Sequence, residues 1–166
     1  FVSTALNQPD YIVKQNQCNA IFQDRSGCLW FASSGLGVLR FDPKTSESVL
    51  FSPSHTHPGQ SLCSGHIRAI DEDADGNLWF GSQDNGLSVY NPVKKSFTNY
   101  SVASGHLKSD VIFDLYKQKN GNMLISTIGV GVTVYDQKQK RFIAYPEAFS
   151  RGTARRTFCA IEDKEG

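Results

Sequence analysis

The sequence has few of the features that mark a nucleic-acid-binding protein, a membrane protein or a metalloprotein. Among its 166 residues, 17 Lys and Arg balance 16 Asp and Glu, and they form no basic stripe that would bind nucleic acid. No apolar run approaches the roughly 18 residues that span a bilayer. The four cysteines show no Cys-x-x-Cys spacing, so we predict no metal site, and their disulfide state stays open.

Patterns typical of catalysis are also absent from the sequence. The Gly-x-Ser-x-Gly elbow of serine hydrolases does not occur. The adjacent carboxylates of Glu72 and Asp73 fall on an expected strand. Successive side chains of a strand project to opposite faces, so these two cannot flank one substrate bond together. We therefore predict that this segment is not an enzyme, has no catalytic residues and uses no cofactor.

What the sequence does contain is an internal repeat. Glycines recur at intervals of 45 to 49 residues, and the last of them is Gly166. An aspartate stands three residues before most of these glycines, and a tryptophan stands three residues after the first two. The residues for which we predict a structural role in the repeat are Gly27, Gly76, Gly121, Trp30, Trp79, Asp24 and Asp73.

Each copy of the repeat predicts four short strands, because aromatic and β-branched runs alternate with Gly, Asn, Asp and Pro. The predicted first strands are 18–23, 67–72 and 112–117, and the second strands are 29–33, 78–82 and 123–127. The third strands are 38–41, 87–90 and 132–135, and the fourth strands are approximately 49–51, 97–100 and 142–145. A period of this length with four strands is typical of a β-propeller, whose four-stranded antiparallel blades surround an axis. We therefore predict an all-β propeller fold.

The predicted propeller is incomplete. We expect about three complete blades plus the start of a fourth, which is below the usual minimum of four. The chain is therefore expected to be a fragment of a larger propeller, and an exposed edge strand at each end would favour a homodimer. The expected parts are a lead-in at 1–17, blade repeats at 18–51, 67–100 and 112–145, and the start of the next repeat at 158–166.

The stretch from Asp71 to Gly76 has two interpretations. Its alternating acidic residues are typical of the first half of an EF-hand calcium loop. However, Ser82 stands where that loop needs a bidentate glutamate, and the residues from Leu78 onward continue as a strand. We therefore interpret the stretch as a turn, in which Asp73 caps backbone N–H groups and the glycine takes a positive φ.

The second copy resembles the two-component regulator propeller repeat at Ile70 to Ser82, Gly86-Leu87 and Tyr90-Asn91. The resemblance extends over roughly residues 18 to 166, although Leu124-Ile125-Ser126 departs from the family pattern. It implies part of the periplasmic sensor region of a bacterial hybrid two-component receptor, many of which respond to oligosaccharides. The resemblance also implies a parent chain with a membrane helix and a histidine kinase. The rest of that chain is then an expected partner, and this segment would be attached to the membrane only through it.

The alternating direction of the strands indicates where a ligand would bind. The loops between second and third strands and the long connectors between copies emerge on one face. Loops held by a rigid scaffold are the usual place for a binding site. We expect an oligosaccharide or another small molecule there. The candidate ligand-binding residues on this face are Gln83, Asp84, Asn85, His55, His57, Arg151 and Arg155.

These candidates also have structural interpretations. Asn85-Gly86 is a typical turn pair. His55 and His57 have no identifiable third metal ligand, so solvated loop histidines are favoured. Solvated arginines in a connector explain the basic residues after 150 equally well. Tryptophan rings can stack on a sugar, but the two tryptophans are expected in the core between blades because their strand position repeats.

Two other functions stay open from the sequence. Lyases that open cyclic peptide antibiotics use related propeller repeats and need a histidine base and a metal. All four histidines lie in or beside the long connectors, at positions 55, 57, 66 and 106. A propeller is also often a protein-interaction platform, which the fold alone does not exclude.

Overall fold

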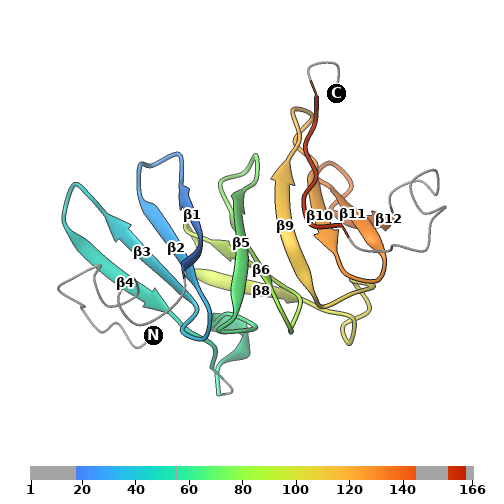
Figure 1. The fold of residues 1–166 in the computed structure, drawn as a ribbon. Coiled ribbons are helices and arrows are strands. Elements are labelled where there is room, and N and C mark those ends of the chain that lie inside the picture. The colour runs from blue at the N-terminus through green and yellow to red at the C-terminus, as the bar shows by residue number, and fades with distance from the viewer. Residues whose placement is uncertain (1–17, 55, 145–156, 164–166) are drawn as a thin grey trace.

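The protein contains three four-stranded antiparallel sheets, seen in a computed structural model that describes residues 18–54, 56–144 and 157–163 (Figure 1). The first sheet, or first blade, consists of β1 (Cys18–Gln23), β2 (Leu29–Ser33), β3 (Val38–Asp42) and β4 (Glu47–Phe51). The second blade consists of β5 (Ile67–Glu72), β6 (Leu78–Ser82), β7 (Leu87–Asn91) and β8 (Ser96–Tyr100). The third consists of β9 (Ile112–Lys117), β10 (Met123–Thr127), β11 (Gly131–Asp136) and β12 (Arg141–Ala144).

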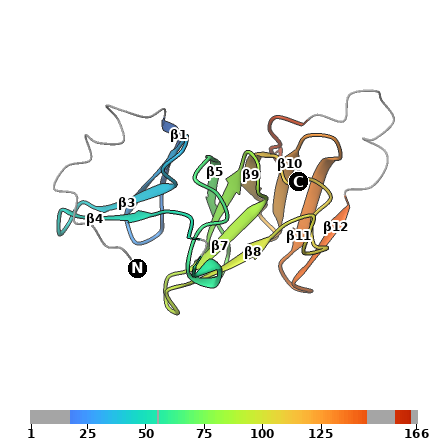
Figure 2. The same cartoon turned by 90° about the horizontal axis from the view of Figure 1, so that it is seen from below.

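The blades are arranged like the segments of a fan. Within each blade the strands follow chain order. The first strands, β1, β5 and β9, lie side by side along one side of the molecule, and β5 contacts both of its neighbours (Figures 1 and 2). The fourth strands, β4, β8 and β12, lie away from them (Figure 2). This arrangement confirms the predicted all-β propeller architecture.

The observed strands agree closely with those predicted from the repeat. The first and second strands of every copy have the predicted bounds, and the third and fourth differ by one or two residues. A short 3-10 helix at Pro58–Gln60, η1, is the only helical element in the described residues. The lead-in at 1–17 lies outside the described residues. The division of the chain into repeats at 18–51, 67–100 and 112–145 stays a prediction.

Each turn between the first two strands of the first and second blades is built around an aspartate. Asp24 Oδ1 accepts bonds from the N–H groups of Ser26 and Cys28, at 2.9 and 3.0 Å. Its Oδ2 accepts a 2.7 Å bond from the indole Nε1 of Trp30, which is only 1% exposed. In the second blade, Asp73 Oδ2 accepts the equivalent bond from Trp79 Nε1, at 3.0 Å.

These aspartate turns leave no need for a cation. Both oxygens of Asp73 accept N–H bonds, Oδ1 from Asp75 and Asn77 and Oδ2 from the Asn77 amide and the Trp79 indole. Gly76 has φ +85°, a conformation open to glycine at little cost. The stretch that resembles a calcium loop is thus a hydrogen-bonded turn leading into β6.

The core lies between the blades. One cluster surrounds Trp30 at the first junction, between the first and second blades, and includes Phe51, Phe80 and Tyr90. A second cluster surrounds Trp79 at the second junction, between the second and third blades. Both tryptophans are buried, at 1% and 2% exposure. The indoles therefore pack in the interior, where they stabilise the stacking of one blade on the next.

A pair of charged residues joins the first blade to the second. Arg25, in the β1–β2 turn, donates its backbone N–H to Glu72 Oε2 at 2.9 Å. Its guanidinium pairs with the same carboxylate and donates to the Asp73 carbonyl at 2.5 Å. We call this arrangement the turn clamp.

The last described segment, residues 157–163, lies against the third blade through a second turn clamp. Lys119 donates its backbone N–H to Glu162 Oε2 at 2.8 Å and its Nζ to the Asp163 carbonyl at 2.8 Å. The repeat places Lys119 at the position of Arg25 and Glu162 at the position of Glu72. No strand is assigned in this described segment. Its contacts nonetheless place it where a next repeat is expected, and the predicted extent of that repeat, 158–166, stays a prediction.

Candidate functional site

The loops expected to carry a ligand do lie together at one end of the blades. The N–H groups of Gly35 and Gly37, in the β2–β3 loop, donate to the carbonyl of Gly65 in the connector before β5. Gly86, in the β6–β7 loop, donates likewise to Asp110 before β9. The two kinds of loop therefore share a face, joined by backbone hydrogen bonds.

The described candidate residues on this face are exposed. Gln83, Asp84 and Asn85 form the β6–β7 loop. The Asn85 N–H donates to Ser82 Oγ at 2.9 Å, so part of this loop has the turn chemistry that its sequence indicates. His57 stands beside η1, and its Nδ1 lies 2.9 Å from Thr56 Oγ1. The other candidates, His55, Arg151 and Arg155, lie outside the described residues.

A β-bulge in the first strand of each blade adds residues that the sequence did not single out. In the pairing of β1 with β2, β5 with β6 and β9 with β10, the register shifts by one residue. The residues left unpaired are Asn19, Arg68 and Phe113, one in each blade. A bulge re-aims the side chain of its extra residue and is frequent beside functional sites.

These bulge residues, together with Phe158, form a row across the inner strands, which we call the inner row. Phe158 stands at the same repeat position as Phe113. The Arg68 guanidinium carbon lies 4.8 Å from the ring centre of Phe113. The ring centres of Phe113 and Phe158 are 4.9 Å apart, at an interplanar angle of 69°. Asn19 continues the row by donating to the carbonyl of Ile67 at 2.8 Å.

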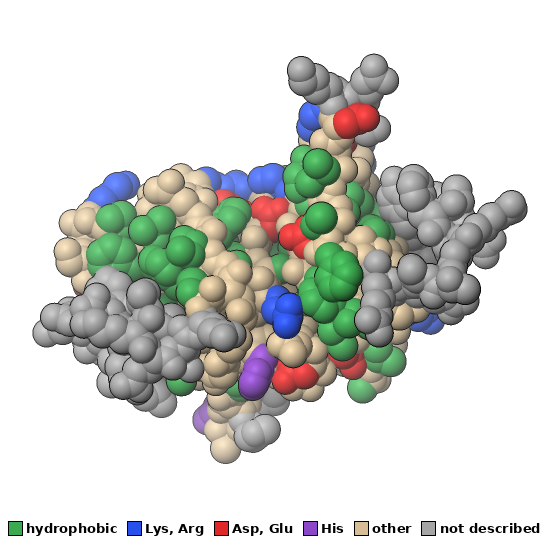
Figure 3. Space-filling view, in the orientation of Figure 1, with side chains coloured by type: hydrophobic (Ala, Val, Ile, Leu, Met, Phe, Trp, Pro, Cys, Tyr) green, Lys and Arg blue, Asp and Glu red, His purple; other side chains and the backbone are tan. Residues whose placement is uncertain are grey.

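The inner row connects to one of the predicted ligand residues. Arg68 Nε donates to Gln83 Oε1 at 3.3 Å, which holds the guanidinium between the β6–β7 loop and the Phe113 ring. Phe158 is 62% exposed. Figure 3 shows basic, histidine and hydrophobic side chains next to one another where β5 and β9 face the viewer. The row thus presents a cation, an amide and aromatic surface together.

Two carboxylates fix the spacing of the strands that carry the inner row. Asp71 on β5 accepts the backbone N–H of Lys117 on β9 at 2.6 Å, and Asp114 on β9 accepts that of Ala160 at 3.2 Å. Burial raises the pKa of both carboxyl groups, more than their backbone hydrogen bonds lower it. These bonds between neighbouring blades hold the inner strands in place beneath the row.

The inner row is suited to bind a polar ring. An aromatic face packs against the C–H face of such a ring, while a guanidinium and an amide bond its hydroxyl or carboxylate oxygens. Metal ligation has less support. Among residues 18–54, 56–144 and 157–163, no three His, Cys, Asp or Glu gather where they could hold an ion.

The repeat did not reveal the inner row because its members differ in chemistry. The same position is Asn, Arg, Phe and Phe in successive copies, so it carries no common residue. The one clue is the constant interval from Arg68 to Phe113 and from Phe113 to Phe158, which equals that of the glycines.

Comparison with protein families gives one match. Residues 13–35 and 61–84 match the family model described as two component regulator propeller. Both segments start before a first strand and end just after a second strand, so they cover the aspartate turns. No curated protein matches the sequence. Within the described residues, no helix has the length and apolar character to cross a membrane.

Solved structures with the same fold include two extracellular domains of proposed hybrid two component systems from B. thetaiotaomicron. The first has a TM-score of 0.68 and 17% identity, over 86% of this chain and 20% of that one. The second has a TM-score of 0.57 and 20% identity, over 72% of this chain and 15% of that one. This chain thus spans a fifth or less of their lengths.

An enzyme shares the fold as well. A virginiamycin B lyase from Staphylococcus aureus has a TM-score of 0.60 and 13% identity, over 86% of this chain and 44% of the lyase. At such identities the likeness concerns the fold alone. It confirms the propeller architecture and leaves the choice between a receptor and an enzyme to the residues of this chain.

Proposed function

We propose that this chain, whose repeats are of the two component regulator propeller type, is part of the extracytoplasmic sensor region of a two-component signalling receptor. The chain has the propeller fold of the extracellular regions of hybrid two component systems. We further propose a periplasmic location and an oligosaccharide ligand. The rest of the receptor chain, including a histidine kinase, would be the partner that receives the signal and the only contact with the membrane.

The observation that carries the proposal is the inner row. Arg68, Phe113 and Phe158 bring a cation and exposed aromatic surface beside the amide of Gln83. Such a surface can hold a sugar ring by its apolar face and its hydroxyl groups at once. The other predicted ligand residues would contact further sugar units; they are Asp84, Asn85, His57, His55, Arg151 and Arg155.

Signalling would need no chemistry in this segment. A ligand that binds one arrangement of the blades more tightly than another shifts the equilibrium between them by the difference in binding free energy. The inner row spans all three blades and residues 157–163, so its ligand would bridge separate parts of the fold. Binding there would change how these parts are held relative to one another.

Calorimetric titration of the full-length chain with a panel of oligosaccharides tests the proposal. Replacing Arg68 by Gln removes a cation and a stacking partner, and should weaken binding about tenfold, the loss of roughly 1.4 kcal/mol. Arg141→Gln, on the outer strand β12, removes the same charge far from the row and should leave affinity unchanged. Equal effects of the two variants, or no binding across the panel, would contradict the proposal.

A lyase-type enzyme is the second candidate, favoured by one structural likeness. Its chemistry would need a histidine base beside a metal. In the described part of the chain, His106 packs against Tyr100 with ring centres 5.2 Å apart, while His57 bonds to Thr56. We therefore propose that this segment is not an enzyme. Elemental analysis of the purified protein distinguishes the two, since a stoichiometric bound metal would favour the lyase.

We also propose that the chain associates with a second copy of itself to form a homodimer. An edge strand left open at the end of a run of blades favours pairing with a second copy. A protein-interaction platform would also use such surfaces. Light scattering at several protein concentrations measures the association: a concentration-dependent dimer is expected, and a constant monomer mass would exclude it.

A further inference from the structure

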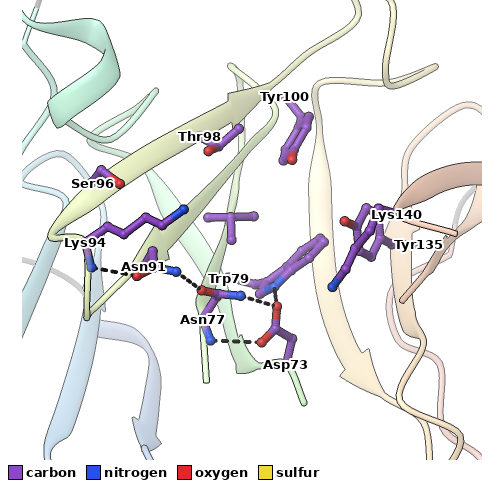
Figure 4. A pocket seen from close by; sticks show the side chains of 11 residues that line it. Asp73, Asn77, Trp79, Asn91, Lys94, Ser96, Thr98, Tyr100, Tyr135 and Lys140 are labelled. Atoms are coloured by element: carbon purple, nitrogen blue, oxygen red, sulfur yellow. Dashed lines mark hydrogen bonds between the residues drawn. The ribbon is translucent and has the colours of Figure 1, made fainter. Parts of the chain in front are cut away.

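A cavity of about 230 Å³ lies at the second junction, near the opposite ends of the strands from the candidate ligand loops (Figure 4). The β5–β6 and β7–β8 turns form one wall, β8 forms a second, and β11 with the turn after it forms the third. The cavity lies away from the inner row, since none of its lining residues belongs to that row. Neither the repeat nor the family match assigns a ligand to this place.

The first junction shows that the fold does not require this cavity. Side chains pack at the equivalent place between the first two blades. Arg40, at the position of Val89, reaches Cys28 Sγ at 2.9 Å and Asp42 Oδ2 at 3.8 Å. Phe51 stacks on the neighbouring indole, with ring centres 5.6 Å apart and planes at 23°. The equivalent space is therefore occupied by the protein's own side chains.

Exchanges at matching repeat positions open the second junction. Val89 replaces the long Arg40, and Ser96 replaces Glu47. Tyr100, at the position of Phe51, turns its ring toward Phe142 and His106, with ring centres 4.9 and 5.2 Å away. Shorter or displaced side chains thus leave room beside Trp79. The opening is a property of these residues rather than of the propeller architecture.

One wall of the cavity is fixed by a chain of hydrogen bonds. Asp73 Oδ2 accepts the Trp79 indole N–H and the Asn77 amide, at 3.0 and 2.9 Å (Figure 4). Asn77 Oδ1 accepts the Asn91 amide at 2.8 Å, and Asn91 Oδ1 accepts the backbone N–H of Lys94 at 2.7 Å. The carboxylate of this wall is therefore engaged within the protein.

The remaining polar groups around the cavity are mostly donors. The Lys94 side chain extends over the cavity, and the hydroxyl groups of Tyr100 and Tyr135 face it (Figure 4). Burial raises the pKa of Tyr100, and burial together with nearby acidic groups raises that of Tyr135 to about 12. Both phenols keep their protons at neutral pH. Lys140 Nζ lies at the rim, where it pairs with Asp75 Oδ2 at 2.7 Å.

We infer that this cavity binds a small carboxylate that carries hydroxyl groups and is about one sugar ring in size. The Lys94 ammonium and two phenol donors complement a carboxylate, and the Ser96 and Thr98 hydroxyls complement further oxygens. The cavity is smaller than the roughly 300–1,000 Å³ typical of drug-sized ligands, which limits the ligand to a single ring. The inference does not depend on the proposed function, since a lyase or a platform would have the same cavity.

Titration of the full-length chain with glucuronate and with glucose tests the inference, because the two probes share a ring and differ in the carboxylate. Glucuronate should bind at least tenfold more tightly than glucose, and its affinity should fall as ionic strength rises. Equal affinities for the two probes, or no binding of either at millimolar concentration, would overturn the inference.

Three variants of the chain locate the site. Val89→Arg fills the cavity as Arg40 does in the first blade, and should abolish glucuronate binding. Lys94→Gln removes an exposed cation, leaves the packing intact and should weaken binding about tenfold. Lys138→Gln, which removes the same charge from an exposed position outside the cavity, should change nothing. Unaltered glucuronate binding by folded Lys94→Gln would overturn the inference, even where Val89→Arg fails to fold.

Discussion

Replacing Asp24 by Ala tests whether the aspartate turn stabilises the first blade as its hydrogen bonds indicate. Asp24 is 9% exposed and accepts four bonds, from the Ser26 N–H and hydroxyl, from the Cys28 N–H and from the Trp30 indole. Alanine leaves the indole and the Cys28 N–H, both buried, without their acceptor. Each orphaned donor costs about 1–3 kcal/mol, so unfolding should become easier by about 3 kcal/mol.

The third blade contains a matched control for this substitution. Gln118 stands at the position of Asp24, and Leu124 stands where the indole would be. The backbone N–H of Gln118 donates to the Asn122 carbonyl at 2.8 Å, a bond that does not involve the Gln118 side chain. Gln118→Ala should therefore change the free energy of unfolding by less than about 0.5 kcal/mol.

Urea unfolding followed by tryptophan fluorescence measures both variants. The expected result is a large fall in the transition midpoint for Asp24→Ala, with an unchanged slope, and almost none for Gln118→Ala. Equal midpoints for the two variants would refute the view that the carboxylate stabilises the turn through the buried indole. The stability of the turn would then come from the glycine and the strand pairing alone.

Three further predictions concern acid stability and the junctions. Burial raises the pKa of Asp24, but the hydrogen bonds to its carboxylate outweigh burial and bring the pKa below its usual value. The stability that the Asp24 carboxylate contributes is therefore present above about pH 4 and is lost as pH falls through the folded-state pKa. Asp24→Asn should thus flatten the acid side of a plot of urea midpoint against pH. Glu72→Ala removes the acceptor of the first turn clamp and should lower stability by about 1 kcal/mol in low salt, measured by thermal unfolding; a matched loss in Glu162→Ala would support the same arrangement at the other end. Gly81→Ala would place a Cβ 2.6 Å from Ile112 Cγ2 and should cost about 1–3 kcal/mol, whereas Gly59→Ala, with nothing within 4 Å, should be neutral; similar melting temperatures for the two would contradict the tight packing.

Most of the fold could be predicted because its determinants are local and repeated. A turn aspartate, a glycine with positive φ and alternating apolar runs recur at a near-constant interval, so each copy confirms the others. The ends of the third and fourth strands differ by one or two residues from those that the repeat predicts. There the turns contain residues such as Ser46 and Lys95, which take a positive φ without being glycine, and no residue type marks them.

The candidate sites could be predicted only in part because they depend on differences between copies. Gln83 was singled out from its loop, but its partner Arg68 is presented by a bulge that shifts the register by one residue. The cavity at the second junction follows from Val89 standing where Arg40 stands one blade earlier. A repeat search averages over such exchanges, so it finds the scaffold and overlooks what distinguishes one junction from the next.

The turn clamp has a consequence for how the blades move. It occurs at the first junction and between the third blade and residues 157–163, but at the second junction Ala74 and Lys117 occupy its two positions. At the second junction the inner strands are joined instead by the 2.6 Å bond from the Lys117 N–H to Asp71. The outer bonds of Lys140 and Gln137 to Asp75 cross this junction at the surface, where salt weakens them. A ligand bound in the cavity would contact both the second and the third blade and would hold them at one angle.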